Sequence, residues 1–223
     1  MQEQLEKRQN TEQNSPKRGR FIVFEGLDGA GKSTQIKGLA KWIRGQGRKV
    51  YVTAEPTTAG TGGLIRDALS GNFLRSPSEL AGLFLADRIA HNVNPVYGIQ
   101  KFLREGTDVI CDRYYYSSFA YQGMDTDLDW IIDANCRCPD IAKPDLCIFL
   151  DLDPENCTRR MSGRGVLEIY EGSEALLQRT RAQFFSVFRR LSKTEEVHVV
   201  DAARSPEEVT GEMIRIVRGE FGQ

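Results

Sequence analysis

The sequence predicts an α/β protein with a doubly wound, five-stranded parallel sheet and helices on both faces. Short apolar runs alternate with longer segments whose apolar residues recur at helical spacing, and a glycine-rich segment joins the first run to the first of these helices. Such alternation is typical of βαβ units around a parallel sheet. Ligands of these sheets bind beyond the carboxyl ends of the strands, so we expect the chemistry there.

Each expected element follows from the same two patterns. The strands are predicted at residues 21–25, 49–53, 108–111, 146–151 and 197–201. The first helix, from residue 33 to about 46, has four apolar residues at helical spacing and ends at Gly45 and Gly47. The other helices are predicted at residues 63–69, 78–92, 96–104, 115–121, 127–135, 155–161, 173–191 and 206–217.

Composition narrows the class of protein. The 223 residues carry 30 Lys and Arg against 31 Asp and Glu, a net charge of −1, so we expect no binding to nucleic acid or to an anionic membrane surface. No apolar run approaches the roughly 18 residues of a membrane span. The five cysteines include no C-x-x-C pair, which predicts neither a disulfide framework nor a zinc site and favours the reducing cytoplasm.

The chain is long enough for one self-sufficient domain. Residues 1–19 contain only two large apolar residues, too few to offset the entropy of ordering, so they are predicted to form a disordered tail. A single domain is expected over residues 20–223.

The strongest motif runs from Gly26 to Ser33 and matches G-x-x-x-x-G-K-[ST] between a predicted strand and a predicted helix. In this phosphate-binding loop, backbone N–H groups converge on phosphate oxygens, a lysine neutralises the β and γ phosphates, and a hydroxyl can ligate Mg²⁺. The alternative, a glycine-rich turn that binds nothing, is disfavoured by the flanking elements. The motif assigns ATP binding to Gly26, Gly29, Ala30, Gly31, Lys32, Ser33 and Thr34, with Ser33 as a metal ligand.

The sequence lacks the N-K-x-D element through which GTP-switch proteins recognise guanine, and it has little room for the extra domains of motors. A small-molecule kinase that uses ATP and Mg²⁺ is the economical interpretation. Asp28 lies inside the loop, where a carboxylate would repel a triphosphate. We therefore expect Asp28 to point towards the acceptor.

Charged residues also follow the third predicted strand. Asp112 can hold Mg²⁺ or its waters, and Arg113 can bind an acceptor phosphate. A structural ion pair at the strand end is the alternative, but the position at the carboxyl edge favours function.

Two further groups of residues give weaker indications of function. Phe84 and Arg88 share one helical face and offer a ring for a base beside donors for its carbonyl, although a core Phe and a surface Arg would give the same pattern. A glycine-punctuated basic stretch contains Arg159, Arg160 and Arg164, which suits a mobile lid at about residues 160–172 that closes over phosphates. A solvated basic loop is the alternative.

Taken together, four segments resemble thymidylate kinases, the enzymes that phosphorylate dTMP. They are residues 24–35, Glu55-Pro56-Thr57, Asp112-Arg113-Tyr114 and Ala120-Tyr121-Gln122-Gly123. The resemblance extends from about residue 20 to the C-terminus. It implies transfer of the γ-phosphoryl group of MgATP to dTMP, giving dTDP and ADP in dTTP biosynthesis, by a cytoplasmic homodimer.

The resemblance also implies roles for single residues. Phe84 would stack on thymine, Arg88 would donate to a thymine carbonyl, and Arg160 would pack on adenine. A tyrosine at position 121 would crowd a ribose 2′-hydroxyl and so favour deoxynucleotides. The substrate-binding residues implied are Asp28, Glu55, Phe84, Arg88, Asp112, Arg113, Ser118, Tyr121 and Gln122, and the metal ligands are Ser33 and Asp112.

Members of the family differ in whether the catalytic arginine lies in the phosphate loop or in the lid. The loop position here is Gly29, so the resemblance implies the lid-arginine type, with Lys32, Arg113 and Arg164 as catalytic residues. The sequence departs from the family at Ala54, where an arginine often binds the dTMP phosphate. Substitutes for this missing ligand would be Arg66, Arg75 or Arg113.

Two alternatives stay open. The first is a kinase for another deoxynucleotide or for a deoxynucleoside; with a deoxynucleoside the acceptor is a neutral hydroxyl, and the reaction would use a carboxylate base such as Glu25. The second is an ATP-binding regulatory module, which would bind ATP without an acceptor. His91 and His198 are interpreted as a helix-surface residue and a strand residue, because neither has a partner at metal-ligand spacing.

Overall fold

The computed structural model describes residues 17–161 and 173–222, and in this part of the chain the expected parallel sheet is confirmed. Its strand order is β2-β3-β1-β4-β5, and every strand pair is parallel. The strands are β1 (Phe21–Gly26), β2 (Val50–Ala54), β3 (Asp108–Asp112), β4 (Leu146–Asp151) and β5 (Val197–Asp201).

The register brings the carboxyl ends of three strands to one edge of the sheet. Asp112 at the end of β3 pairs with Phe24 of β1 on one side and with Ala54 of β2 on the other. The segment that follows β1 therefore lies beside the ends of β2 and β3. This edge is where ligands of a doubly wound sheet bind.

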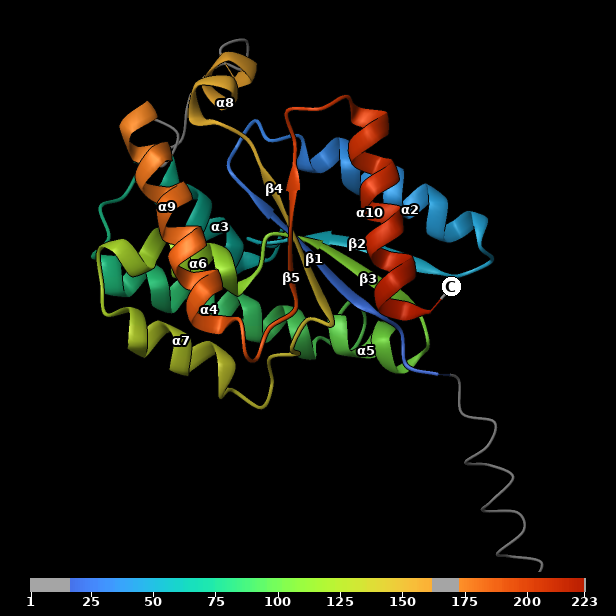
Figure 1. Cartoon of the computed structure of the whole chain (residues 1–223). Coiled ribbons are helices and arrows are strands. Elements are labelled where there is room, and N and C mark those ends of the chain that lie inside the picture. Colours follow the sequence, from blue (N-terminus) through green and yellow to red (C-terminus); the bar gives the residue numbers. More distant parts are fainter. Residues whose placement is uncertain (1–16, 162–172, 223) are drawn as a thin grey trace, which may run out of the picture.

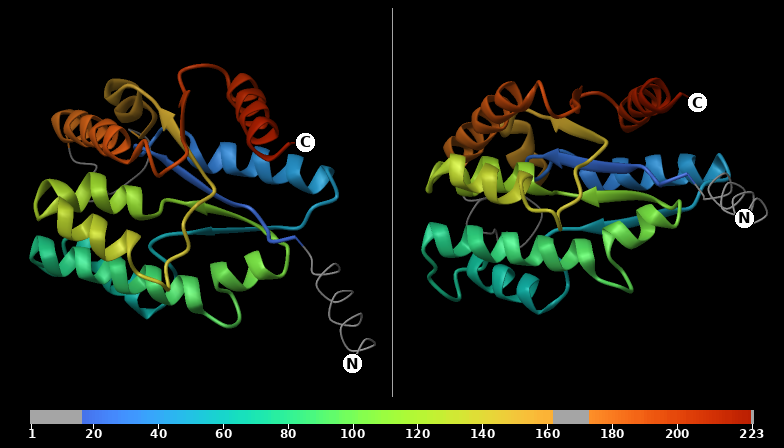
Figure 2. Two further views of the ribbon diagram at one scale, coloured as in Figure 1. Left: turned by 60° about the horizontal axis from the view of Figure 1, so that its bottom comes forward. Right: turned by 90° about the horizontal axis from the view of Figure 1, so that it is seen from below.

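Helices cover both faces of the sheet (Figure 1). Helices α2 (Lys32–Gly45) and α10 (Pro206–Phe221) pack together on one face, and α4 (Pro77–Val93), α6 (Tyr115–Tyr121) and α9 (Glu174–Leu191) lie on the other. Helix α3 (Gly60–Leu69) packs on α4, and α5 (Ile99–Arg104) packs against β3. Helix α7 (Leu128–Cys136) lies beside α6, from which the short helix η1 (Gln122–Met124) separates it in the sequence. Helix α8 (Pro154–Met161) follows β4 and contacts α9. The further views in Figure 2 show the same layers.

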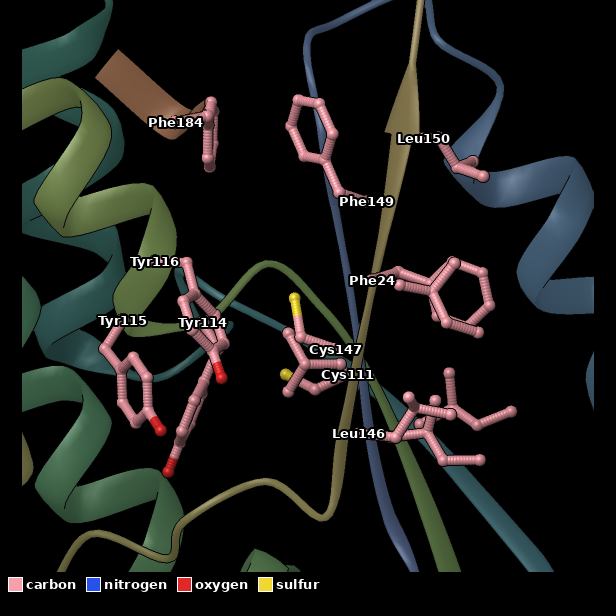
Figure 3. Close-up of a cluster of buried hydrophobic side chains, with 14 of the residues drawn as sticks. Phe24, Cys111, Tyr114, Tyr115, Tyr116, Leu146, Cys147, Phe149, Leu150 and Phe184 are labelled. Atoms are coloured by element: carbon pink, nitrogen blue, oxygen red, sulfur yellow. The ribbon is translucent and has the colours of Figure 1, made fainter. Parts of the chain in front are cut away.

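The core lies on both sides of the central strands. Side chains alternate between the two faces, so in Figure 3 Phe149 points towards Phe184 of α9 while Leu150 points towards α2. The Phe149 and Phe184 rings are 5.0 Å apart, and both side chains are fully buried. Three consecutive tyrosines, Tyr114–Tyr116, pack on the same side as Phe184 and fix the start of α6 against the sheet.

The helix expected at residues 96–104 begins only at Ile99, and that prediction is wrong at its start. The side-chain Oδ1 of Asn94 accepts hydrogen bonds from the N–H groups of Val96 and Tyr97, at 2.8 and 3.0 Å. This local turn competes with the helix, because it uses backbone donors that a helix would need. The apolar residues at 96 and 97 gave a misleading helical spacing.

The structured chain begins before residue 20. The N–H group of Gly19 donates to the Leu103 carbonyl at 2.8 Å, and Arg18 pairs with Asp145 at 2.6 Å. Residues 18 and 19 thus contact the domain instead of belonging to a free tail. Residues 1–16 lie outside the described part, where the expected tail stays a prediction.

Candidate active site

The glycine-rich segment forms the turn between β1 and α2. Gly26, Gly29 and Gly31 have φ angles of 144°, 85° and 95°, which residues with a side chain rarely adopt. Helix α2 begins at Lys32 with neither a side-chain cap nor an acidic residue in its first turn. Its first N–H groups are therefore available to an anion, and they lie at the positive end of the helix dipole.

Lys32 is buried within this loop. Its Nζ donates to the carbonyls of Gly26 and Leu27, at 3.0 and 3.2 Å, and lies 3.6 Å from Asp28 Oδ1. Burial and the positive charge of Arg113 lower the pKa of Lys32 from its ordinary value. The ammonium is held at the loop, where phosphates that bind to the helix N-terminus would meet it.

Asp28 and Arg113 form an ion pair across the loop and the end of β3. Arg113 donates from Nη2 to Asp28 Oδ1 at 2.7 Å and from Nη1 to Ser117 Oγ at 3.0 Å. Burial works to raise the pKa of Asp28, but the charges of Arg113 and Lys32 outweigh it and hold the pKa below its usual range. Arg113 has a φ of 65°, a strained conformation for a residue other than glycine.

Glu25 stabilises the backbone that follows Arg113. The Glu25 carboxylate accepts hydrogen bonds from the N–H groups of Tyr114 and Ser117 and from Ser117 Oγ, at 2.9, 3.1 and 2.6 Å. Burial raises the pKa of Glu25 to about 7, against the opposing charge of Arg113 and these hydrogen bonds. The carboxylate thus binds the start of α6, which holds Arg113 in its strained position.

An aromatic cavity of about 250 Å³ opens beyond the strand ends, on the α4 and α6 side. Phe84 and Arg88 from α4 line it together with Tyr121 and Gln122, the four residues to which the resemblance assigns contacts with the base and sugar. The full lining of this cavity is Asp28, Glu55, Pro56, Leu69, Phe84, Arg88, Arg113, Tyr114, Ser117, Tyr121 and Gln122. An aromatic ring beside fixed donors suits a planar heterocycle.

A phosphate cavity of about 210 Å³ lies at the glycine-rich loop. It is lined by Asp28, Gly29, Gly31, Lys32, Ser33, Thr34, Ala54, Glu55, Asp112 and Arg113. Asp28, Glu55 and Arg113 line both this cavity and the aromatic cavity. Two ligands bound in the two cavities would therefore meet at these three side chains.

Asp112 and Ser33 offer oxygen ligands in the phosphate cavity. The Oδ1 atom of Asp112 is buried and has no hydrogen-bond partner among the described residues. A carboxylate oxygen without a donor beside a serine hydroxyl fits Mg²⁺, which prefers oxygen ligands and shares them with phosphates.

A third cavity, of about 340 Å³, lies between the glycine-rich loop and α10. Arg160 lines it from the end of α8, with its Nη2 atom 3.4 Å from the Ala202 carbonyl. Arg204 and Pro206 also line this cavity. The resemblance implies that Arg160 packs on adenine, and that role stays a prediction.

Comparisons with known proteins agree with this geometry. The sequence model of the family described as thymidylate kinase matches residues 24–213. The chain belongs to the thymidylate kinase family. A probable thymidylate kinase from Pyrococcus horikoshii is 38% identical over 211 residues, covering 92% of this chain and 98% of that protein. A probable thymidylate kinase from Methanococcus aeolicus is 38% identical over 200 residues, covering 88% of this chain and 94% of that protein. The solved structure of thymidylate kinase from Candida albicans superimposes with a TM-score of 0.77 at 26% identity, covering 91% of this chain and 92% of that one.

Ser118 does not line the aromatic cavity but lies behind Arg88, whose Nη2 atom donates to Ser118 Oγ at 3.2 Å. Arg164 lies outside the described residues. The helix-surface interpretation of His91 is wrong, because its side chain is buried, between Glu55 and Thr53.

Of the proposed substitutes for an arginine at Ala54, only Arg113 lines the phosphate cavity. Arg66 donates to the Thr57 carbonyl, and Arg75 pairs with Glu79 at the surface. Neither of these two side chains lines the aromatic or the phosphate cavity.

The sequence did not identify Ser117 and Asn135, which hold Arg113 and Arg88 respectively. Ser117 directly precedes a predicted site residue and could have been found from the helical spacing after Arg113. Asn135 lies 47 residues from Arg88, and only the fold brings the two together.

Proposed function

We propose that this chain transfers the γ-phosphoryl group of ATP to dTMP, giving dTDP and ADP in dTTP biosynthesis. The observation that carries the proposal is the shared boundary of two cavities, where Asp28, Glu55 and Arg113 face both. ATP phosphates bound at the glycine-rich loop and a nucleotide bound beside Phe84 would meet at this boundary. Membership of the thymidylate kinase family supports dTMP as the acceptor.

The reaction requires two anions to approach each other. A phosphate oxygen of dTMP forms the new bond to the γ phosphorus, and the bond from that phosphorus to the β–γ bridging oxygen breaks, leaving ADP. The second pKa of such a phosphate is about 6, so the acceptor is already largely dianionic at neutral pH and needs no general base. Catalysis is therefore electrostatic and positional, and Lys32 and Arg113 supply positive charge at the boundary.

Ser33 and Asp112 would hold Mg²⁺, which would neutralise the charge that develops on the phosphate oxygens. The unpaired Asp112 oxygen supports this assignment. Arg113 pairs with Asp28, and we infer that this pair keeps the guanidinium at the boundary for the acceptor phosphate.

For the base, the proposal uses Phe84 as a stacking surface and Arg88 as a donor to a thymine carbonyl. Tyr121 lies at the same cavity, with its ring 5.3 Å from the Arg113 guanidinium carbon, and would crowd a ribose 2′-hydroxyl. Gln122 completes the sugar side. Arg160 would pack on adenine in the third cavity.

The proposal also includes the lid-arginine type, with Arg164 as a catalytic residue and a lid at about residues 160–172 of a single domain. Support comes from Gly29, where the other type has its arginine. A Cβ at this position would lie 2.7 Å from the Cys157 carbonyl oxygen, and the φ of 85° disfavours any side chain. Both observations disfavour an arginine at position 29, which supports Arg164 as the source of the additional positive charge.

Two properties of the whole protein complete the proposal. Pairing as a homodimer follows from the family resemblance. A cytoplasmic location is supported by the five cysteines, which are all free. None of the described helices is both long and apolar enough to cross a membrane.

A nucleoside kinase that uses Glu25 as a base is less well supported. Glu25 is fully buried, accepts three hydrogen bonds from Tyr114 and Ser117, and lines neither cavity. It is therefore poorly placed to take a proton from a hydroxyl acceptor.

The decisive experiment incubates the purified chain with MgATP and each of dTMP, dUMP, dCMP, dGMP, UMP and thymidine. Chromatography then quantifies ADP and the phosphorylated acceptor, and Lys32→Ala serves as the control for contaminating kinases. We expect dTDP to form fastest. Conversion of another acceptor in preference to dTMP would overturn the assignment, and ATP binding without any phosphorylated product would favour a regulatory module.

A further inference from the structure

Arg88 is held by partners from three separate parts of the chain. Its Nε donates to Glu55 Oε2 at 2.8 Å, its Nη1 to Asn135 Oδ1 at 2.6 Å and its Nη2 to Ser118 Oγ at 3.2 Å. These contacts use three of the five guanidinium N–H donors. The other two belong to Nη1 and Nη2, so they are the donors that Arg88 can offer to a ligand in the aromatic cavity.

Glu55 in turn is shared between two side chains. Its Oε2 accepts from Arg88, and its Oε1 lies 3.0 Å from His91 Nδ1. A carboxylate only accepts hydrogen bonds, so Nδ1 carries the hydrogen that His91 donates. The other ring nitrogen, Nε2, lies 2.8 Å from Thr53 Oγ1, which fixes the ring from its far side.

His91 itself does not reach the aromatic cavity. Its side chain is 3% exposed, and it lines a different cavity, of about 610 Å³, along β2. His91 is therefore linked to the Arg88 side chain through Glu55, and Glu55 lines both the aromatic and the phosphate cavities. Without the His91 contact, the Glu55 carboxylate could turn towards the acceptor phosphate, which it would repel.

We propose that His91 is a positioning residue for acceptor recognition, which holds the Glu55 carboxylate so that Arg88 keeps a fixed pair of donors facing the base. The proposal rests on the proposed function and deepens it. Fixed donors match an oxygen acceptor such as O4 of thymine and do not match the amino group that cytosine carries at the same position. His91 thus affects both the affinity for dTMP and the preference for dTMP over dCMP.

The test compares His91→Leu, which removes the donor to Glu55, with His91→Asn, whose amide nitrogen lies at the same number of bonds from the backbone as Nδ1. For His91→Leu we expect the KM for dTMP to rise about tenfold or more, the size expected for losing a hydrogen bond to a charged group. The KM for ATP should stay within about twofold, and the dTMP-to-dCMP ratio of kcat/KM should fall by a similar tenfold factor. His91→Asn should restore most of the lost dTMP affinity.

His198→Leu, a substitution of a partly exposed histidine on β5, is the matched control and should leave all these constants unchanged. If His91→Leu does not fold, His91→Gln removes the Nδ1 donor while keeping a polar side chain, and the same comparison applies. A folded variant with wild-type KM for dTMP and wild-type base preference overturns the inference, even if its Tm is lower. If the wild-type chain itself fails to phosphorylate dTMP, the proposed function fails first, and the two failures are thereby distinguished.

Discussion

Arg113 combines a positive charge at the proposed site with a strained backbone. It carries the positive charge at the boundary of the two cavities, and it is held there by Asp28, Ser117 and a strained backbone. Glu25 accepts hydrogen bonds from the N–H groups of Tyr114 and Ser117, and these bonds hold the backbone after Arg113 in place against the strain. Positioning of this kind reduces the reorganisation that catalysis would otherwise require.

We therefore expect Arg113→Ala to lower kcat/KM for dTMP by about 10²-fold or more, the size seen when a contact to developing charge is removed. Steady-state kinetics, with the dTMP concentration varied at saturating MgATP, measure this loss in kcat/KM. Arg104→Ala, an arginine on the surface of α5, provides the control and should have wild-type kinetics. A loss of less than about threefold for Arg113→Ala would argue against its role at the transferred phosphoryl group.

Asp112 gives a separate prediction that concerns the metal. Removal of its carboxylate in Asp112→Ala should raise the Mg²⁺ concentration needed for half-maximal activity by about tenfold or more, because second-sphere and direct carboxylate partners commonly contribute 10- to 100-fold to metal binding. Activity measured over a Mg²⁺ titration at fixed ATP provides the test. Asp125→Ala, which removes an exposed carboxylate that lines neither the aromatic nor the phosphate cavity, is the control. An unchanged Mg²⁺ requirement would remove Asp112 from the metal site.

At the scale of elements, the site depends on how closely α8 packs against the glycine-rich loop. The Cys157 carbonyl in α8 would lie 2.7 Å from a Cβ at position 29. This contact links the loop that is proposed to bind ATP to the helix that carries Arg160. A side chain at position 29 would therefore disturb two parts of the proposed ATP site together.

We expect Gly29→Ala to reduce the free energy of unfolding by about 1–3 kcal/mol, the usual cost of a side chain at a positive φ, and to weaken ATP binding. Gly45→Ala is the matched control, since no atom lies within 4 Å of its Cβ position and it lies at the end of α2. That control should be neutral or slightly stabilising, because alanine favours helix more than glycine does. Chemical denaturation and calorimetric ATP titration measure both effects. Equal stability of the two variants would show that the loop and α8 can separate at little cost.

The elements were predicted well wherever periodicity was the dominant signal. The strand at residues 146–151 and the helix at residues 115–121 have the predicted bounds. Predictions failed where a single side chain redirects the backbone, as at Asn94, or where burial depends on distant segments, as at His91. No local pattern indicates that Asn135 will meet Arg88, because 47 residues and four elements (α5, β3, α6 and η1) separate them.

At the scale of the whole molecule, the site exists only when the sheet is complete. Arg113 meets Asp28 across 85 residues, and Ser117 meets Glu25 across 92. These pairs form because β1 and β3 are neighbours in a parallel sheet, although they are far apart in the sequence. Because these contacts join segments that are far apart in the sequence, they form only when the whole domain folds. A group that titrates in the site should therefore affect the free energy of unfolding of the entire domain.

Glu25 provides that link between pH and stability. Burial raises its pKa from an ordinary value of 4.5 to about 7, so between these two values the unfolded chain releases a proton that the folded chain retains. The stability contributed by this group is therefore greatest below about pH 4.5 and falls as the pH rises to about 7. The low pKa of Asp28 acts in the opposite direction, but its effect is confined to more acidic pH and is constant above about pH 5.

The measurement compares wild type with Glu25→Gln by denaturant unfolding from pH 5 to pH 8. The amide does not ionise, so the stability of wild type relative to the variant should fall by roughly 2 kcal/mol over this range. Glu79→Gln, at an exposed residue in the first turn of α4, should show no such change relative to wild type. If the difference between wild type and Glu25→Gln does not vary with pH, then Glu25 titrates alike in the folded and unfolded chains. Its burial beneath the start of α6 would then carry no electrostatic cost, because the N–H groups of Tyr114 and Ser117 compensate for the lost water.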